Sequence, residues 1–152
     1  LEITDVVLIS GAAQYDELNS LTPQNDPRFQ LHSFVSKDMQ VYLGAADVVV
    51  ARAGATTILE LAALAKPTIL VPNGRLVAGH QLKNAKVYAD KQAVLVLDEN
   101  KFDTAGDVSL VKAIKRVLQD TTLRQTLSSA IYTFAKPHAA RDMAEIILKA
   151  AR

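Results

Sequence analysis

A short apolar run in the middle of the chain constrains the fold more than any other feature. Val48-Val49-Val50-Ala51 is rich in β-branched residues and does not alternate with polar ones, as is typical of a parallel strand covered on both faces. The run leads into the small-residue turn Ala53-Gly54-Ala55 and then into a helical pattern. A buried strand followed by a helix is the repeating unit of α/β proteins, so the chain is predicted to form a parallel sheet with helices on both faces.

The same alternation of apolar runs and helical patterns extends up to Asp98. Strands are predicted over Val6–Ile9, Phe29–Ser33, Val48–Ala51, Thr68–Val71 and Ala93–Leu97. Helices are predicted over Tyr15–Ser20, Lys37–Ala46, Thr57–Ala65 and Gln81–Lys91, as in an α/β fold. Beyond Asp98 only helices are predicted, from two apolar stripes and a last amphipathic segment: Val108, Val111, Ile114, Val117 and Leu118; Leu123, Leu127, Ile131 and Phe134; and Ala139–Ala151.

Composition excludes several classes of protein. The 152 residues are 49% hydrophobic, which predicts one domain with a substantial core. The net charge of +1 provides no basic stripe for nucleic acid. The absence of cysteine excludes disulfides, thiolate metal sites and a cysteine nucleophile, and is compatible with a cytoplasmic protein. No apolar run approaches the ~20 residues of a membrane span, so any membrane contact is expected to be peripheral.

The turn at Arg52–Thr57 is the first candidate ligand site. Thr57 and Glu60 have the spacing of a capping box, which predicts a helix that begins near Thr57. Small residues let a ligand approach the main chain, and the positive end of the helix favours an anion such as a diphosphate. Taken alone, the segment is explained equally well by helix capping and tight packing.

Two further segments follow predicted strands, where ligands of open parallel sheets collect. The loop from Pro72 to Gly79 is longer than the usual ~2–6 residues, and unusual length often marks a functional loop. His80, Gln81 and Asn84 share one helical face with donors and acceptors suited to sugar hydroxyls, although they are also acceptable as ordinary surface residues. The segment Ser33–Met39 predicts only a turn, with Ser36 or Asp38 as N-cap.

Other motifs of catalysis are missing from the sequence. It contains no G-x-S-x-G, no G-x-x-x-x-G-K-[ST] and no G-x-G-x-x-G, which lowers support for a hydrolase, a P-loop NTPase or an ordinary dinucleotide enzyme. His32 and His138 have no partner at metal-ligand or catalytic spacing, so both are predicted to be structural. No metal site is expected.

The ordered combination of motifs resembles the carboxyl-terminal, donor-binding domain of the MurG family, in glycosyltransferase family 28. The motifs are Phe34-Val35-Ser36-Lys37-Asp38-Met39, Ala46-Asp47, Arg52-Ala53-Gly54-Ala55-Thr56-Thr57 with Glu60-Leu61, Lys66-Pro67, Pro72, and His80-Gln81-x-x-Asn84-Ala85. The resemblance implies the carboxyl-terminal half of a GT-B fold, with residues 1–152 forming a Rossmann-like domain that binds the nucleotide sugar UDP-N-acetylglucosamine (UDP-GlcNAc).

The resemblance also implies roles for individual residues. The backbone at Val35 would lie against the uracil, and Arg52, Ala53, Gly54, Ala55, Thr56 and Thr57 would face the diphosphate. Glu60 would accept hydrogen bonds from the ribose. His80, Gln81 and Asn84 would face the N-acetylglucosamine and its neighbouring phosphate, although many relatives have glutamine in place of His80.

Enzymes of this family move N-acetylglucosamine from UDP-GlcNAc to the lipid-linked muramyl-pentapeptide, converting lipid I to lipid II in peptidoglycan synthesis, and so serve cell-wall biogenesis, cell shape and cell division. The implied reaction is an inverting hexosyl transfer without metal or other cofactor, at the cytoplasmic face of the cell membrane, by a peripheral protein. Two alternatives stay open: a related UDP-sugar transferase with another lipid acceptor, and a non-catalytic nucleotide-binding or interaction module.

The sequence departs from the family pattern in two places. The family's first strand and its Gly-Gly-Ser turn have no counterpart, and Val6–Ile9 with Ser10-Gly11 resembles the second strand. In a doubly wound order the first strand is central, so a gapped or rearranged sheet is expected. The amino-terminal domain, which binds the lipid-linked acceptor and is thought to supply the base, is also absent. No catalytic residue is therefore expected in this chain, and the fragment alone is expected to be inactive.

Overall fold

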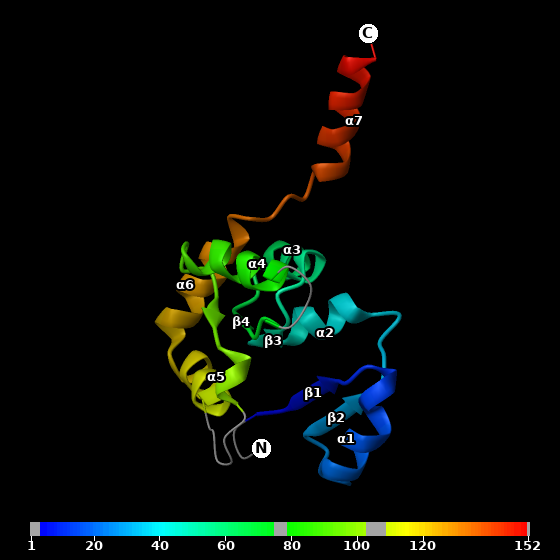
Figure 1. Ribbon diagram of the computed structural model, residues 1–152, viewed down its shortest axis with the longest axis vertical. Coiled ribbons are helices and arrows are strands. Elements are labelled where there is room, and N and C mark those ends of the chain that lie inside the picture. The colour runs from blue at the N-terminus through cyan, green and yellow to red at the C-terminus, as the bar shows by residue number, and fades with distance from the viewer. Residues whose placement is uncertain (1–3, 75–78, 103–108, 152) are drawn as a thin grey trace. The chain divides into compact units, whose positions relative to one another are not determined.

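The computed structural model describes residues 4–74, 79–102 and 109–151. The chain divides into two compact units, Leu1–Tyr42 and Leu43–Arg152, whose elements can be followed in Figure 1. Within the described ranges, no helix has the length and apolar character needed to cross a membrane.

The first unit contains two parallel strands. β1 (Val6–Ile9) pairs with β2 (Phe29–His32), and between them lie the short 3-10 helix η1 (Ala12–Gln14) and α1 (Tyr15–Leu21). α2 (Met39–Ala45) starts in this unit directly after Asp38, whose carbonyl accepts a hydrogen bond from the Val41 N–H. Of the two N-cap candidates, Ser36 and Asp38, the boundary favours Asp38. None of residues 4–42 is buried.

The second unit contains a three-stranded parallel sheet in the order β3-β4-β5. Its strands are β3 (Val49–Ala51), β4 (Thr68–Leu70) and β5 (Leu95–Val96). The central strand β4 has no solvent exposure at any residue. Val50 of β3 is 40% exposed, so the prediction that this strand is covered on both faces is wrong; it describes β4, which has a strand on each side.

Strand positions agree with the prediction, and the pairing is parallel as predicted. β1 has the predicted bounds, and the other four strands are shorter than predicted. The described strands form two separate sheets instead of one continuous sheet.

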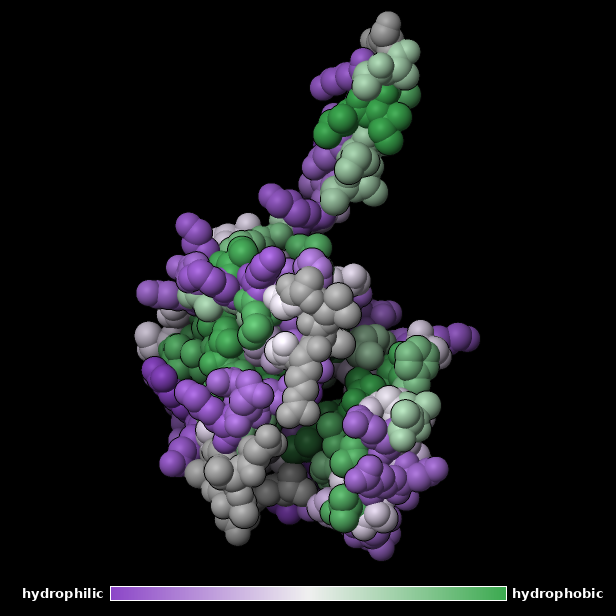
Figure 2. All heavy atoms as spheres, viewed as in Figure 1, coloured by the Kyte–Doolittle hydropathy of each residue, from purple (hydrophilic) through white to green (hydrophobic). Residues whose placement is uncertain are grey.

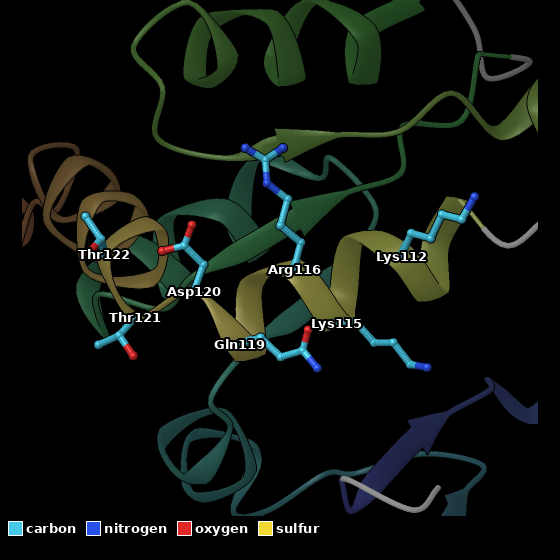
Figure 3. Close-up of a pocket in the computed structure, with 7 residues that line it drawn as sticks. All are labelled: Lys112, Lys115, Arg116, Gln119, Asp120, Thr121 and Thr122. Carbon is cyan, nitrogen blue, oxygen red and sulfur yellow. The ribbon is translucent and has the colours of Figure 1, made fainter.

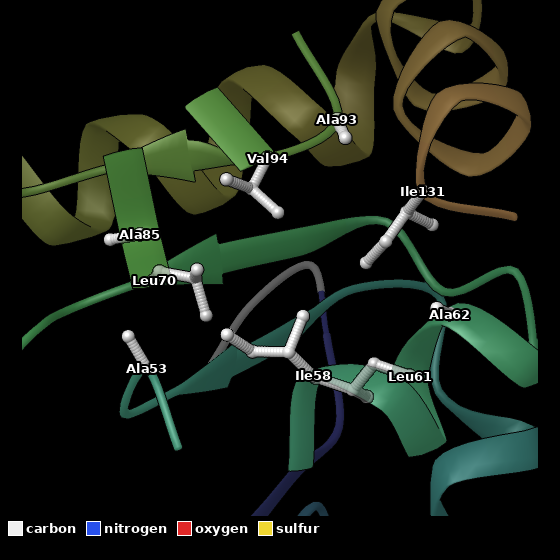
Figure 4. Packing of buried hydrophobic residues seen from close by; sticks show 9 residues of the cluster. All are labelled: Ala53, Ile58, Leu61, Ala62, Leu70, Ala85, Ala93, Val94 and Ile131. Carbon is white, nitrogen blue, oxygen red and sulfur yellow. The ribbon is translucent and has the colours of Figure 1, made fainter. Parts of the chain in front are cut away.

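Helices cover both faces of the second sheet. They are α3 (Ala55–Ala63), α4 (His80–Ala89), α5 (Ser109–Gln119) and α6 (Thr121–Tyr132). Neighbouring residues of a strand point to opposite faces, and accordingly Leu70 belongs to one buried cluster and Ile69 to another. Figure 4 shows the first cluster, in which α3 packs on Leu70 together with residues of α4 and α6. The second cluster joins Ile69 to Val117 of α5 and Leu127 of α6.

The predicted covering helices are confirmed by the buried residues Val117, Leu127 and Ile131. Val111 is 50% exposed, so its place in the apolar stripe was predicted wrongly. Val108 lies outside the described residues. The last helix, α7 (Ala139–Ala150), also forms as predicted. Its apolar residues are exposed and give the helix the apolar surface seen in Figure 2; they are Met143, Ile146, Ile147 and Leu148.

Candidate functional site

The turn after β3 presents main-chain N–H groups at the start of α3. Gly54 is the N-cap, with extended backbone angles (φ −72°, ψ 134°), and its carbonyl accepts the first helical hydrogen bond, from the Ile58 N–H at 3.0 Å. Three N–H groups precede that bond, those of Ala55, Thr56 and Thr57, and no hydrogen bond within the described residues takes them. Ala55 and Thr56 are exposed. The groups are therefore available to an anion.

The predicted capping box is wrong. α3 begins at Ala55, two residues before Thr57, and no side chain of the described residues caps it. Ile58 has no solvent exposure, and its hydrogen bond to Gly54 already places Ala55 and Thr56 inside the helix. By contrast, α6 has a side-chain cap, because Asp120 accepts a hydrogen bond from the Leu123 N–H. Within the described ranges, no side chain therefore competes with an anion for the N–H groups at the start of α3.

One side chain from α4 and one of the turn's own hold this turn in place. Asn84 of α4 donates from Nδ2 to the Ala53 carbonyl at 3.0 Å. The Ala53 side chain has no solvent exposure and belongs to the core. Asn84, predicted to face a sugar, thus lies beside the turn that was predicted to face the diphosphate. The structure brings these two parts of the predicted site together.

Arg52 extends from the turn towards the ends of the neighbouring strands. Its Nη1 donates to the Val71 carbonyl, which follows β4, at 3.1 Å. Its Nη2 lies 2.5 Å from the Glu99 carboxylate in η3 (Glu99–Lys101), the short 3-10 helix after β5. The arginine side chain is 51% exposed. Its guanidinium is therefore already engaged by two acceptors.

Asn73, which follows β4, is hydrogen-bonded to one of the predicted sugar-binding residues. Gln81 accepts a hydrogen bond at Oε1 from the Asn73 N–H at 2.9 Å. Gly79 precedes α4 in the left-handed conformation, with φ 62°, which glycine adopts without strain. His80 is the first residue of α4 and is exposed. Residues 75–78 of this long loop lie outside the described residues.

The other two predicted residues differ in their setting. Glu60 is exposed on α3, one turn beyond the free N–H groups, and its carboxylate has no hydrogen bond or ion pair within the described part of the chain. Val35 is half-buried in the segment between β2 and α2. It belongs to the first unit, whereas all the other predicted residues belong to the second.

An open hollow of about 620 Å³ lies elsewhere, where α5 meets α6. Its lining consists of Lys112, Lys115, Arg116, Gln119, Asp120, Thr121 and Thr122. Figure 3 shows Arg116 and Asp120 pointing to one side of α5 while Lys115 and Gln119 point to the other. The cations do not converge on one point, and none of these residues was predicted as part of a site.

Comparison with known families decides the assignment of the chain. The family model described as the glycosyltransferase family 28 C-terminal domain matches residues 1–145. The chain belongs to this family. Glycosyltransferase family 28 was the family that the motifs resembled, so that prediction is confirmed.

Curated relatives in this family share about a third of their aligned residues with the chain. The UDP-N-acetylglucosamine--N-acetylmuramyl-(pentapeptide) pyrophosphoryl-undecaprenol N-acetylglucosamine transferase of Bacillus licheniformis is 33% identical over 144 residues, which is 93% of this chain and 38% of the relative. The enzyme of the same name from Bacillus cytotoxicus is 34% identical, over 94% of this chain and 39% of the relative. The chain thus spans about two fifths of the length of these relatives.

Solved structures agree with the family in fold. A crystal structure of Acinetobacter baumannii MurG matches with a TM-score of 0.78 and 23% identity, over 98% of this chain and 42% of that one. The glycosyltransferase VinC, in complex with DTDP, matches with a TM-score of 0.63 and 21% identity, over 86% of this chain and 29% of that one. The prediction that the chain has the fold of the carboxyl-terminal half of a GT-B glycosyltransferase is confirmed.

Sequence reasoning missed Glu99. Its segment was interpreted only as the point where the alternation of strands and helices ends. The available signal was an acidic residue close behind the carboxyl end of a predicted strand, which is the edge where ligands of parallel sheets collect.

Proposed function

We propose that this family 28 domain is the donor-binding part of a transferase that moves N-acetylglucosamine from UDP-GlcNAc to the lipid-linked muramyl-pentapeptide of peptidoglycan synthesis. The names of these relatives state this donor group and this acceptor class. The observation that carries the proposal is the uncapped start of α3, with three N–H groups free within the described residues and two of their residues exposed.

Each part of UDP-GlcNAc is assigned to its own group of residues in the proposed site. The diphosphate binds the N–H groups of residues 55–57, and Glu60, one helical turn further, accepts hydrogen bonds from the ribose. His80, Gln81 and Asn84 contact the sugar and its adjoining phosphate, each amide using the polar atom that its hydrogen bond to the backbone leaves free. The backbone at Val35 contacts the uracil.

The proposed chemistry is an inverting, metal-independent transfer. The acceptor hydroxyl attacks the anomeric carbon, the bond to the diphosphate breaks, and UDP leaves with the electron pair. Negative charge grows on the diphosphate during this step, and preorganised N–H dipoles stabilise such charge most effectively. The base comes from an acceptor-binding domain at the cytoplasmic face of the membrane, so the 152-residue chain alone is expected to bind donor without turnover.

Ala55→Pro tests the carrying observation. Proline fits the first position of a helix but has no N–H, and the extended angles of Gly54 suit a residue before proline. Calorimetric titration with UDP-GlcNAc should show binding weakened by about 10-fold or more, the effect of one hydrogen bond to a charged group. Thr121→Pro makes the same change at the first position of α6 and should leave binding unchanged.

Equal affinity of the Ala55→Pro variant and the unchanged chain for UDP-GlcNAc would contradict the proposal. Glu60→Ala should also weaken UDP-GlcNAc, and should not alter inorganic phosphate, which has no ribose. Tighter binding of UDP-glucose than of UDP-GlcNAc would instead indicate a transferase with another donor and another lipid acceptor. Donor binding without restored transfer, after the chain is mixed with an amino-terminal domain, would indicate a non-catalytic nucleotide-binding module.

A further inference from the structure

Arg52 joins the carboxyl ends of three strands through one guanidinium group. It follows β3 directly, it donates to the Val71 carbonyl just after β4, and it pairs with Glu99 in η3 just after β5. An arginine presents several donors in one rigid plane, so it can hold two acceptors at a fixed separation in a way that a lysine cannot.

These contacts continue the pairing of the sheet beyond its strands. The Val71 N–H donates to the Ala51 carbonyl at 2.9 Å, and the Leu97 N–H donates to the Leu70 carbonyl at 2.9 Å. At the next position the Val71 carbonyl is taken by Arg52. The side chain thus supplies a link where strand pairing stops.

The link restrains residues 71–73, which follow β4 directly. Val71 is held by Arg52, and two residues later the Asn73 N–H is held by Gln81. Without Arg52 the Val71 carbonyl loses its partner while the Val71 N–H stays paired with Ala51, so residues 71–73 gain freedom and the bond between Asn73 and Gln81 opens more often. An effect of Arg52 on the sugar side of the site therefore needs no contact between Arg52 and the donor.

The charge of Arg52 is also compensated. Its Nη2 lies 2.5 Å from the Glu99 carboxylate, and charge-assisted pairs of this kind are among the stronger hydrogen bonds. A diphosphate that bound the same guanidinium would either displace Glu99 or lie close to the negative charge of the Glu99 carboxylate, which repels it. Both of these disfavour Arg52 as a diphosphate ligand.

We infer that Arg52 is a positioning residue, anchored by Glu99, that holds residues 71–73 after β4 in place, and that it is not a ligand of the diphosphate. The consequence for the donor rests on the proposed function. The restraint itself is a property of the chain without any ligand.

Amide hydrogen exchange of the ligand-free chain tests the restraint. Arg52→Ala and Glu99→Gln should each raise the exchange rate of the Asn73 amide by about 3- to 10-fold, the effect of losing one modest hydrogen bond. Lys86→Gln removes another exposed ion pair, with Asp90, and should leave the Asn73 amide unchanged. Unchanged exchange in Arg52→Ala and Glu99→Gln would overturn the inference.

Titrations with UDP-GlcNAc, UDP and UMP test how Arg52 acts on the donor. Positioning predicts that both variants weaken UDP-GlcNAc by about 3- to 10-fold, that the double variant is no weaker than either single one, and that the ratio of UDP to UMP affinities stays constant. Arg52→Lys should lose as much as Arg52→Ala, since a charge alone does not replace two directed contacts.

A collapse of the UDP to UMP ratio in Arg52→Ala, together with tighter UDP binding by Glu99→Gln, would show a direct diphosphate ligand and overturn the inference. Failure of the proposed function would look different. The unchanged chain would then bind no UDP-GlcNAc. The exchange rate of the Asn73 amide would still decide whether Arg52 and Glu99 hold residues 71–73 in place.

Discussion

The two units are built from similar strands and have very different interiors. β1 (Val-Val-Leu-Ile) is as apolar as β4 (Thr-Ile-Leu). Yet no residue among 4–42 is buried, whereas β4 has no exposure at all. β4 has a strand on each side and helices on both faces. Burial is thus decided by the neighbours that a strand acquires, and not by its own composition.

The same difference separates the parts of the proposed site. The turn at residues 52–54 is attached to the buried cluster through Ala53, and Asn73 after β4 is attached to α4 through Gln81. Val35 lies in the first unit, where none of residues 4–42 is buried. Preorganised groups bind at a lower entropic cost, so the diphosphate and sugar ends of the donor should meet a more rigid surface than the base does.

The largest expected effect comes from the core of the second unit. Leu70→Ala should lower the free energy of unfolding by about 3 kcal/mol, because it removes a fully buried side chain and leaves a cavity. Leu8→Ala, the same change at a half-buried position of β1, should cost about 1 kcal/mol. Urea titration, with amide exchange to follow each unit separately, measures both. Equal losses would remove the contrast between the units.

A smaller effect is expected where a lysine holds the end of a helix. Lys66 donates from Nζ to the carbonyls of Gly44 and Ala46 at 2.6 and 2.9 Å, at the end of α2. Lys66→Met should cost about 2 kcal/mol, as for hydrogen bonds from a charged donor. Arg28→Met breaks an exposed pair with Asp26 in the first unit and should cost less. Thermal unfolding of the two variants compares them, and a greater loss for Arg28→Met would reverse the comparison.

At two glycines with positive φ, we expect a substitution to lower the free energy of unfolding more in the first unit than in the second, the reverse of the two comparisons above. Gly79 has left-handed helical angles, and Gly79→Ala should cost about 1 kcal/mol. Gly11 has φ 79° and ψ 153°, a region used almost only by glycine, so Gly11→Ala should cost about 2 kcal/mol. Among the described residues, an alanine Cβ would meet no heavy atom within 4 Å at either position, so the two variants compare backbone strain. Urea midpoints that rank the two alanine variants the other way would contradict this.

The smallest effects should appear at the two ends of the pH range. The backbone and side-chain hydrogen bonds from Arg28 lower the pKa of Asp26 below 3.8, so its contribution to the first unit is present above that pH and lost as the pH falls. Burial raises the pKa of Tyr88 above 10.0, so its contribution to the second unit is present below that pH and lost as the pH rises.

Asp26→Asn should therefore flatten the acid limb of stability measured on the first unit, and Tyr88→Phe the alkaline limb measured on the second. Amide exchange at pH 3 to 5, and circular dichroism at alkaline pH, provide these two readouts. An alkaline limb that survives Tyr88→Phe would show that another group controls it.

The fold was predictable because its signals are local. Non-alternating β-branched runs predicted the strands, and the spacing of Leu123, Leu127 and Ile131 predicted α6 with its buried face. The exposure of Val50 was not predictable from its run, since it depends on which strands and helices lie beside β3. The start of α3 was misplaced because Thr57 and Glu60 have capping spacing, whereas burial of Ile58 sets the helix boundary.

The sequence predicted which segments form the candidate site, but it did not predict which residues contact one another there. The rule that ligands collect behind parallel strands located Arg52 and Asn84. It could not show that Asn84 donates to Ala53, or that Arg52 reaches Glu99, which lies 47 residues further along the chain. Such pairs are brought together only by packing.

The uncapped start of α3 has a consequence for how this protein could change under selection. Its three N–H groups belong to every amino acid except proline, so substitutions at residues 55–57 would alter the bulk around a bound anion without deleting its donors. An inhibitor directed at these groups would meet nearly the same hydrogen-bonding pattern in each variant, and resistance would have to arise through steric obstruction or at more distant positions.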